Sequence, residues 1–339
     1  MMGSGLVLAI ETSCDETAVA VADLDGNPFI SRISSQIALH APYGGVVPEL
    51  ASRNHNADLR PLIESTLADA GLTPADIGVV AATSGPGLAS SLLVGNTTAK
   101  AIAVGLGCPF YSINHMEGHL LSPFIGRGRP IEKHVALIVS GGHTLLIEFS
   151  GIGKYRRLGS TKDDAAGEAF DKVGKMLDLP YPGGPEIAKV ASTGRNDAFD
   201  FPRSMIQSGD FDFSFSGLKT SALHAIERAG ESLEGSVLAD FCASFQEAIV
   251  DVLVSKLLQA AEATGLKIVT VSGGVSCNQR LRQRIAEACG SRGLDLVLAD
   301  PAYSTDNAAM IAFAAAARLR AGISSSSLHE DIDPNLKLA

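Results

Sequence analysis

The sequence predicts an α/β protein built from two related halves. Three apolar runs end in Ser-Gly turns, which lie at 84–87, 140–143 and 272–275. An apolar run that ends in this way, before a helix or a second strand, is typical of a buried strand opening onto a tight turn. Because glycine has no Cβ, backbone N–H groups at such a turn can approach a phosphate closely. Three such turns in one chain favour a nucleotide held between the two halves.

The order of the elements indicates a duplication. Residues 8–21 have the pattern strand, polar turn, strand, and residues 136–147 repeat it. Downstream, each half has a strand, a Ser-Gly turn and a long amphipathic helix, expected over 88–106 and 278–290. Strand–glycine–helix units are common in any α/β chain. The matched order of two different units nevertheless favours duplication.

The two halves differ in length. The interval from the polar turn to the Ser-Gly turn is about 59 residues longer in the second half, and a Gly/Pro/Asp/Phe-rich stretch near 179–221 accounts for the surplus. The expected organisation is an N-terminal lobe over 1–133, a C-terminal lobe over 134–322 and a flexible tail over 323–339. Within the insertion, Phe211, Phe213 and Phe215 alternate with polar residues, a period of two that predicts a half-buried strand.

The composition fits an enzyme of the cytoplasm. A chain of 339 residues can form two domains with substantial cores. The 35 glycines and a charged fraction of 19% agree with buried sheets and tight turns. No long uncharged apolar run predicts a membrane span, and no signal peptide is expected. Five scattered cysteines form no disulfide framework, so a reducing compartment is expected.

The net charge of −10 makes the chain a poor nucleic-acid binder by itself. The basic groups that exist are local. Arg280 and Arg284 are four apart and lie on one face of the predicted helix over 278–290. The ordinary interpretation of such a cluster is a solvated surface.

Two histidines, His115 and His119, are four residues apart in a predicted helix. At this spacing their imidazoles lie on one face and can hold one metal ion. Glu117 lies on another face, so the pattern differs from the His-Glu-x-x-His motif of metallopeptidases. A lone histidine pair can also be structural, and a metal needs a third ligand. Asp306, at the start of the last apolar helix, is the candidate, although a carboxylate there also stabilises a helix N-terminus.

Asp15 and Glu16 lie in the turn between the first two predicted strands. A hairpin turn needs at most one such carboxylate for capping. At a nucleotide site, the pair could orient a nucleophile, accept a proton or hold a hydrated cation. A second polar group spreads over two helical turns and contributes one or two side chains that reach a ribose, the others facing solvent: Asp163, Asp164, Glu168, Asp171 and Lys172.

Several motifs together resemble one family. They are Glu11-Thr12-Ser13-Cys14-Asp15-Glu16-Thr17, Tyr43-Gly44-Gly45-Val46-Val47-Pro48-Glu49, Asn114-His115-Met116-Glu117-Gly118-His119, Asp164-Ala165-Ala166-Gly167-Glu168-Ala169-Phe170-Asp171, Tyr181-Pro182-Gly183-Gly184-Pro185, Phe213-Ser214-Phe215-Ser216-Gly217 and Ser304-Thr305-Asp306-Asn307. The chain resembles, over roughly 6–322, the bacterial TsaD-type tRNA threonylcarbamoyladenosine transferases, once misnamed glycoprotein endopeptidases.

The resemblance implies a duplicated actin-like ATPase fold (ribonuclease H-like), with two lobes and a central ligand cleft. It also implies transfer of a threonylcarbamoyl group from threonylcarbamoyl-AMP to the N6 amine of the adenosine beside the anticodon, in tRNAs that read codons starting with A. Sugar kinases and chaperone ATPases share the fold but lack the paired histidines. A non-catalytic paralogue would have lost both histidines and Asp306.

Site residues follow from the resemblance by position. His115, His119 and Asp306 match the metal ligands, for one divalent ion, with Fe²⁺ favoured over Zn²⁺. Asp15 and Glu16 match the catalytic turn, and which of them is the base stays open. The groups expected to hold the adenylate are Ile138, Val139, Ser140, Gly141, Gly142, Asp171, Gly184 and Asn278.

Partners are also implied. They are tRNA, an inactive TsaB-like paralogue bound through the N-terminal lobe, and a small TsaE-like P-loop ATPase; no membrane is involved. In the N-terminal lobe, an apolar helical stripe at 59, 62, 63, 66 and 67 could form a partner surface, or could equally face the core of its own lobe.

Overall fold

A computed structural model describes residues 5–339, apart from the side chain of Glu231. The described chain divides into two units. The first contains residues up to Ile131, Gly151–Lys154 and Ala302–Ala339; the second contains Glu132–Ser150 and Tyr155–Pro301. The chain therefore returns to the first unit for its last helix and its tail.

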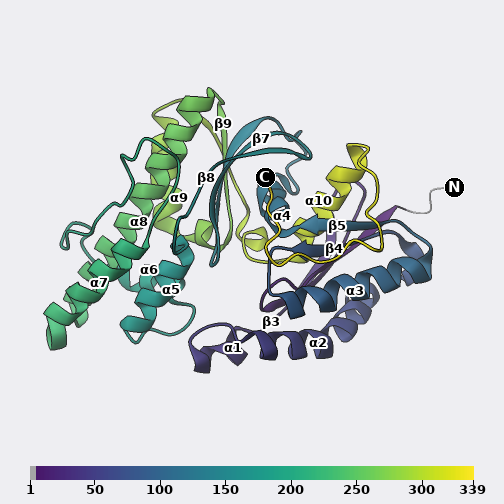
Figure 1. Ribbon diagram of the computed structural model, residues 1–339, viewed down its shortest axis with the longest axis horizontal. Helices are drawn as coiled ribbons and strands as arrows, with labels where there is room; N and C mark the ends of the chain where they lie inside the picture. Colours follow the sequence, from purple (N-terminus) through teal and green to yellow (C-terminus); the bar gives the residue numbers. More distant parts are fainter. Residues whose placement is uncertain (1–4) are drawn as a thin grey trace. The chain divides into compact units, whose positions relative to one another are not determined.

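The first unit is built on a five-stranded sheet of order β3-β2-β1-β4-β5 (Figure 1). Strand β1 pairs antiparallel with β2 and parallel with β4, which pairs parallel with β5. The carboxyl ends of β1, β4 and β5 therefore meet at one edge of the sheet. The strands are β1 (Leu6–Glu11), β2 (Glu16–Ala22), β3 (Pro28–Ser35), β4 (Ile77–Gly85) and β5 (Phe110–Asn114).

Helices cover both faces of this sheet. In Figure 1, α2 (Pro48–Asp69) and α3 (Ala89–Leu106) lie on one side, and α4 (His115–Leu121) and α10 (Ala308–Arg320) on the other. Short α1 (Ile37–His40) precedes α2. Ten consecutive residues of α10 are buried, most of them alanines, which lets the helix lie close to β1 and β2. The predicted stripe on α2 faces the core: Leu59 and Leu67 are buried, and Leu62 and Ile63 pack against them.

The second unit repeats the topology of the first. Its sheet has the order β10-β9-β6-β7-β8, and β6 pairs antiparallel with β7 and parallel with β9, as β1 does with β2 and β4. The strands are β6 (His134–Val139), β7 (Thr144–Gly151), β8 (Lys154–Ser160), β9 (Ile268–Ser272) and β10 (Asp295–Leu298). The predicted duplication is confirmed.

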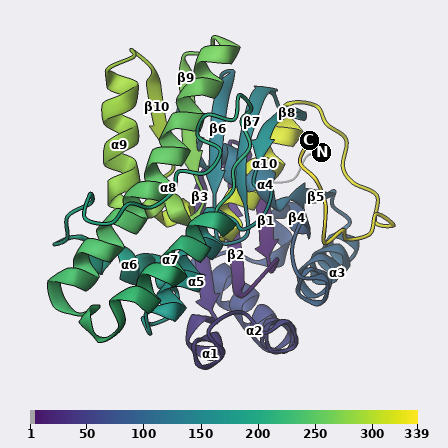
Figure 2. The same ribbon diagram turned by 60° about the vertical axis from the view of Figure 1, so that its left-hand side comes forward.

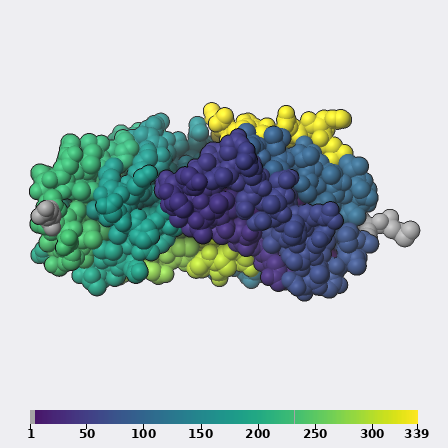
Figure 3. Space-filling model, turned by 90° about the horizontal axis from the view of Figure 1, so that it is seen from below, coloured from purple at the N-terminus to yellow at the C-terminus, as the bar shows by residue number. Residues whose placement is uncertain are grey.

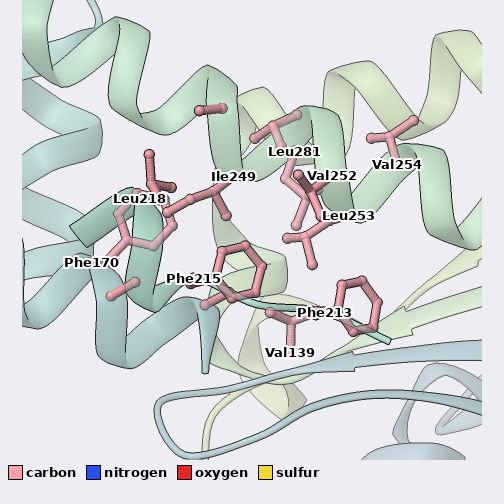
Figure 4. Close-up of a cluster of buried hydrophobic side chains, with 14 of the residues drawn as sticks. Val139, Phe170, Phe213, Phe215, Leu218, Ile249, Val252, Leu253, Val254 and Leu281 are labelled. Atoms are coloured by element: carbon pink, nitrogen blue, oxygen red, sulfur yellow. The ribbon is translucent and has the colours of Figure 1, made fainter. Parts of the chain in front are cut away.

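Long helix α8 (Gly235–Thr264) organises the core of the second unit (Figure 2). It contacts β6, α6 and α9, and Figure 4 shows its Ile249, Val252 and Leu253 above Val139 of β6. The other helices of this unit are α5 (Ala166–Met176), α6 (Gly183–Ala191), α7 (Ser216–Ala229) and α9 (Gln279–Gly290).

The predicted strand at Phe211–Phe215 is wrong. Phe213 makes only an isolated bridge with Thr161, and α7 begins at Ser216. Phe213 and Phe215 are buried in the core of the second unit, as Figure 4 shows, whereas the hydroxyl of Ser214 between them donates to Asp163 (2.6 Å). The alternation therefore reports alternate burial of an irregular segment, without a ladder of backbone hydrogen bonds.

The boundary expected at 322 differs from the structure, because residues 302–322 pack in the first unit. The tail is also bound rather than separate. The Ser326 N–H donates to the Phe110 carbonyl (2.8 Å), and the Asp333 N–H donates to that of Ser84 (2.8 Å). Since β5 is an edge strand, the tail satisfies backbone groups that its free edge would leave unpaired. No described helix is both long enough and apolar enough to cross a membrane.

Candidate metal centre and ligand-binding turns

The two histidines are positioned by a capped helix at the end of β5. The Asn114 side chain accepts the N–H of Met116 (2.8 Å), which fixes the first turn of α4. His115 is the first residue of this helix and His119 lies one turn later, with ring centroids 4.8 Å apart and perpendicular planes. Both side chains are buried. The predicted helix and the shared face are confirmed.

The third predicted ligand comes from the other end of the chain. Asp306 lies just before α10, whose first turn is capped by Asn307 accepting the N–H of Met310 (2.9 Å). Gly118 has no side chain, and an added Cβ would lie 3.0 Å from the Met310 Cγ. The glycine between the histidines therefore allows α10 to approach α4 and to deliver Asp306.

The three side chains converge on one point. Asp306 Oδ1 lies 3.3 Å from His115 Nε2 and 3.2 Å from His119 Nε2, and the potential ligand atoms all lie within 4.8 Å of one another. Two donors bound tetrahedrally at about 2.1 Å from one ion would be about 3.4 Å apart. The residues therefore fit a metal, and two imidazoles with one carboxylate suit Fe²⁺ or Zn²⁺.

Glu11 is a site residue that the sequence reasoning missed. This fully buried carboxylate ends β1, and its Oε2 lies 3.0 Å from His115 Nδ1, which also lies 3.2 Å from the Ser13 hydroxyl. These contacts orient the ring so that Nε2 faces Asp306, as the outer partners of metal-bound histidines commonly do. The signal in the sequence was a lone charged residue at the end of a buried strand.

The electrostatics of the cluster favour a cation. Burial alone would lower the pKa of His115, but the charges of Asp306 and Glu11 raise it well above its usual value. Burial would raise the pKa of Asp306, but His115 and then His119 hold it well below its usual range. Positive charge is therefore stabilised here, whether a proton or a metal supplies it, and metal binding must displace the proton of His115.

Glu117 does not belong to this cluster. It is buried, and its Oε2 lies 2.6 Å from the Arg318 guanidinium of α10. The carboxylate that a metallopeptidase would place beside the metal is thus part of a structural ion pair. This agrees with the helical face predicted for Glu117.

The carboxylates of the first hairpin turn lie near the metal ligands. Asp15 is half-buried, and burial raises its pKa. Glu16 begins β2, and its Oε1 accepts the Ser35 hydroxyl (2.8 Å). Burial raises the pKa of Glu16 to about 7, and the charge of Asp306 contributes to the increase for both carboxylates. Glu16 Oε2 is buried and has no hydrogen-bond partner among the described residues.

The second hairpin turn presents bare backbone. Ile138 and Val139 end β6 in the core, and the Ser140 N–H closes the turn on the His143 carbonyl (2.8 Å). Gly141 and Gly142 are exposed, and a Cβ added to either would meet no atom within 4 Å.

The other residues expected at the adenylate have defined local roles. Asp171 Oδ1 accepts the N–H groups of Gly183 (2.9 Å) and Gly184 (3.3 Å). Asp171, which belongs to α5, therefore caps the N-terminus of α6. Asn278 caps α9 by accepting the Leu281 N–H (3.0 Å), and its amide donates to Gln246 (2.6 Å). Asp171 and Gly184 are brought together, as one ligand site would require.

The comparisons with known proteins identify the family. A model of the TsaD family, described as tRNA N6-adenosine threonylcarbamoyltransferase, matches residues 29–313. The chain belongs to this family. It is 50% identical over 326 residues to the tRNA N6-adenosine threonylcarbamoyltransferase of Variovorax paradoxus, covering 95% of this chain and 92% of that protein. The relative from Chromobacterium violaceum is 48% identical, with 93% of each chain covered. The protein is thus a transferase that places threonylcarbamoyl on N6 of an adenosine in tRNA.

Solved structures support the predicted fold. The chain superposes on T. kodakarensis HypF with a TM-score of 0.63 and 16% identity, covering 94% of this chain and 48% of that one. It also superposes on component A of the (R)-2-hydroxyglutaryl-CoA dehydratase of Acidaminococcus fermentans, with a TM-score of 0.53 and 13% identity, covering 94% and 98%. The actin-like ATPase fold is confirmed.

Proposed function

We propose that the chain takes threonylcarbamoyl from threonylcarbamoyl-AMP and transfers it to the adenosine adjacent to the anticodon, in tRNAs reading codons that start with A, with release of AMP. The observation that carries the proposal is the buried His115–His119–Asp306 cluster beside a carboxylate turn, in a chain that belongs to the TsaD family.

The donor is a mixed anhydride, so no covalent enzyme intermediate is needed. The N6 lone pair attacks the carbamoyl carbon, the bond from that carbon to the phosphate oxygen breaks, and its electron pair leaves with AMP. The adenine amine is a weak nucleophile because its lone pair is delocalised into the ring. The reaction therefore depends on placement and on a group that accepts the N6 proton.

Asp15 or Glu16 is the proposed proton acceptor. A base works best when its pKa is near the operating pH, and burial raises the pKa of Glu16 to about 7. The adenylate would be held in the second unit by the backbone of 138–142, by Asp171 with Gly184, and by Asn278. Exposed glycine backbone at 141 and 142 supports this assignment, because it can approach a phosphate without steric conflict.

One divalent ion, Fe²⁺ favoured over Zn²⁺, would be held by His115, His119 and Asp306. When bound, it supplies positive charge that polarises and orients phosphate or carbamoyl oxygens. We expect His115→Ala to abolish stoichiometric metal binding and transferase activity with the fold intact, since two ligands bind far more weakly than three. Metal analysis of the purified variant tests this, with exposed His224→Ala as the control. Undiminished occupancy would contradict the assignment.

The proposed partners are tRNA, a TsaB-like paralogue and a TsaE-like ATPase, in the cytoplasm. The chain carries a net charge of −10. Its basic helix α9 offers little to compensate, because Arg280 and Arg284 both pair with Glu247. An isolated chain with this charge is a weak ligand for phosphates.

We expect weak tRNA binding and negligible turnover from the isolated protein, and recovery of both when the partners are added. Affinity of the assembled system should fall steeply as salt rises. Titrations at several salt concentrations and single-turnover assays measure this. Complete modification by the lone protein at physiological salt would contradict the partner requirement.

A further inference from the structure

A continuous chain of buried polar side chains leads to the carboxylate turn in the first unit. The Val47 N–H donates to His40 Nδ1 (3.3 Å), and His40 Nε2 lies 3.3 Å from Gln36 Oε1. The Gln36 amide lies 3.2 Å from His55 Nδ1, and His55 Nε2 lies 2.9 Å from the Cys14 carbonyl. Both histidines are fully buried, and Gln36 is 2% exposed. None of these three side chains contacts the metal ligands in the described contacts.

The groups at the two ends of this hydrogen-bonded path, the Val47 N–H and the Cys14 carbonyl, determine which ring nitrogens carry hydrogens. The Cys14 carbonyl can only accept, so His55 Nε2 carries a hydrogen. Burial lowers the pKa of His55, so the ring is neutral and Nδ1 is an acceptor. The single lone pair of Nδ1 is shared by the Thr17 hydroxyl (2.7 Å) and the Gln36 amide (3.2 Å). At the other end, His40 Nδ1 accepts the Val47 N–H, so Nε2 carries the hydrogen and donates to Gln36. Along the path from Val47 through His40, Gln36 and His55 to the Cys14 carbonyl, each donor therefore points toward the turn.

The turn is held at two successive carbonyls. His55 holds the Cys14 carbonyl, and the backbone N–H of Gln36 donates to the Asp15 carbonyl (3.3 Å). The remaining hydrogen of the Gln36 amide donates to the Ala51 carbonyl (3.4 Å). A buried polar network with all its groups satisfied specifies one geometry, because any other arrangement leaves an unpaired group in the interior.

The end of this hydrogen-bonded path that is farther from the carboxylate turn lies in an exposed segment. Residues 41–44 lie at the surface between α1 and α2, and Tyr43 is 58% exposed. In Figure 3 this purple to dark-blue segment forms part of the visible surface of the first unit. The Tyr43-Gly44-Gly45-Val46-Val47 motif contains none of the residues proposed for the metal or the adenylate, and its last backbone N–H is the first donor of this hydrogen-bonded path.

We infer that His55, Gln36 and His40 are positioning residues that hold the Cys14–Asp15 backbone so that the carboxylates of Asp15 and Glu16 stand in their reactive positions. The inference rests on the proposed role of this turn in accepting the N6 proton. His55 acts through the turn and touches no substrate in this scheme.

The test compares His55→Leu, which removes the three hydrogen bonds of His55 to Cys14, Thr17 and Gln36, with His55→Gln, whose amide retains a donor for the Cys14 carbonyl. Exposed Asn56→Ala on the same helix is the control. In the reconstituted system, we expect His55→Leu to lower kcat at least about tenfold while the adenylate KM changes less than about twofold. Metal content should stay stoichiometric, and backbone amides of 12–17 should exchange faster. His55→Gln should recover part of both properties.

Three results distinguish the possibilities. Unchanged kcat, or unchanged amide exchange at 12–17, would overturn the inference. A second test combines His55→Leu with the Asp15→Asn/Glu16→Gln variant. If the fold-loss of kcat in the combined variant equals the product of the two separate losses, His55 acts independently of the carboxylates and the inference is overturned. Full turnover in Asp15→Asn and Glu16→Gln would instead refute the proposed base, while amide exchange still reports whether His55 holds the turn. If His55→Leu does not fold, Gln36→Met removes the central amide and should give the same pattern.

Discussion

The β1–β2 and β6–β7 hairpins occupy the same place in two sheets of the same topology, but their turns have opposite chemistry. The first turn carries Asp15 and leads into Glu16, and His55 and Gln36 hold its backbone carbonyls. The second turn exposes Gly141 and Gly142, with no atom within 4 Å of an added Cβ. One copy thus offers fixed side chains and the other offers free backbone. The proposed function assigns the reaction to the first turn and adenylate binding to the second.

A second pair of turns shows where the two units are alike. An added Cβ at Gly87 would lie 2.4 Å from the Ser13 carbonyl, and at Gly273 it would lie 2.3 Å from that of Val139. In each unit, the glycine turn after the parallel strand packs against the neighbouring hairpin. The fold requires glycine at 87 and 273, whereas Gly141 and Gly142 are exposed and have space for a side chain.

The largest expected effect concerns the first turn. Asp15→Asn removes a charge with little change in volume, so adenylate affinity should survive. If Asp15 is the base, kcat should fall by ~10²-fold or more, the usual contribution of a general base. Glu16→Gln, assayed in parallel, shows which of the two accepts the proton. Lost binding with unchanged chemistry would mean that the first turn only cradles the nucleotide, and the division between the hairpins would fail.

Gly142→Val should have the converse effect in the second turn. The added side chain has space in the free protein, so stability should be retained. Its bulk would lie where the protein backbone is proposed to contact the adenylate. We expect adenylate affinity to fall about tenfold or more, which corresponds to about 1.4 kcal/mol. Calorimetric titration and thermal unfolding measure the two properties.

Gly273→Val is the matched comparison. Its φ of +88° and the close Val139 carbonyl predict a loss of stability of about 2 kcal/mol or more, through backbone strain and overpacking. Equal destabilisation by the two substitutions would remove the distinction between binding and structural glycines.

Local patterns in the sequence predicted much of this arrangement. Apolar runs that end in polar or Ser-Gly turns located the hairpins and the duplicated order, and the spacing of His115 and His119 placed two ligands on one helical face. These properties depend on residues a few positions apart, which share a strand or a helix. Asp306 was a candidate third ligand from its place at the start of the last apolar helix, the resemblance matched it to the metal ligands, and the structure brings it within 3.3 Å of both histidines.

Contacts between distant segments could not be predicted in this way. Glu11 contacts His115, which lies 104 positions later in the sequence. The tail beyond Ile323 returns to form hydrogen bonds with β4 and β5. The links between His55 and the first turn depend on how α2 packs against β2. No periodicity encodes such packing. The Phe211–Phe215 segment failed for the opposite reason, since alternate burial occurred there without a partner strand.

The smallest expected effect is on the pH dependence of stability, which distinguishes Glu16 from Asp15 in the first turn. Burial raises the pKa of Glu16 from 4.5 to about 7. Between these values the native protein keeps a proton that the unfolded chain releases, so this group makes stability fall as pH rises through that window. Glu16→Gln removes the effect. Its Tm relative to wild type should therefore rise between about pH 4.5 and 7 and change little above.

Thermal unfolding of both proteins across this range, at constant metal content, measures the difference. Exposed Glu262→Gln, on the solvent side of α8, is the control and should give a constant Tm difference, because its carboxylate stays in water in both states. The expected gain is a few degrees at most, since one partly buried carboxylate is a small part of the free energy of unfolding. A pH-independent Tm difference for Glu16→Gln would mean that the Glu16 carboxylate is as well solvated as in the unfolded chain. It would then lack the raised pKa that suits a base at neutral pH, and Asp15 would be the stronger candidate.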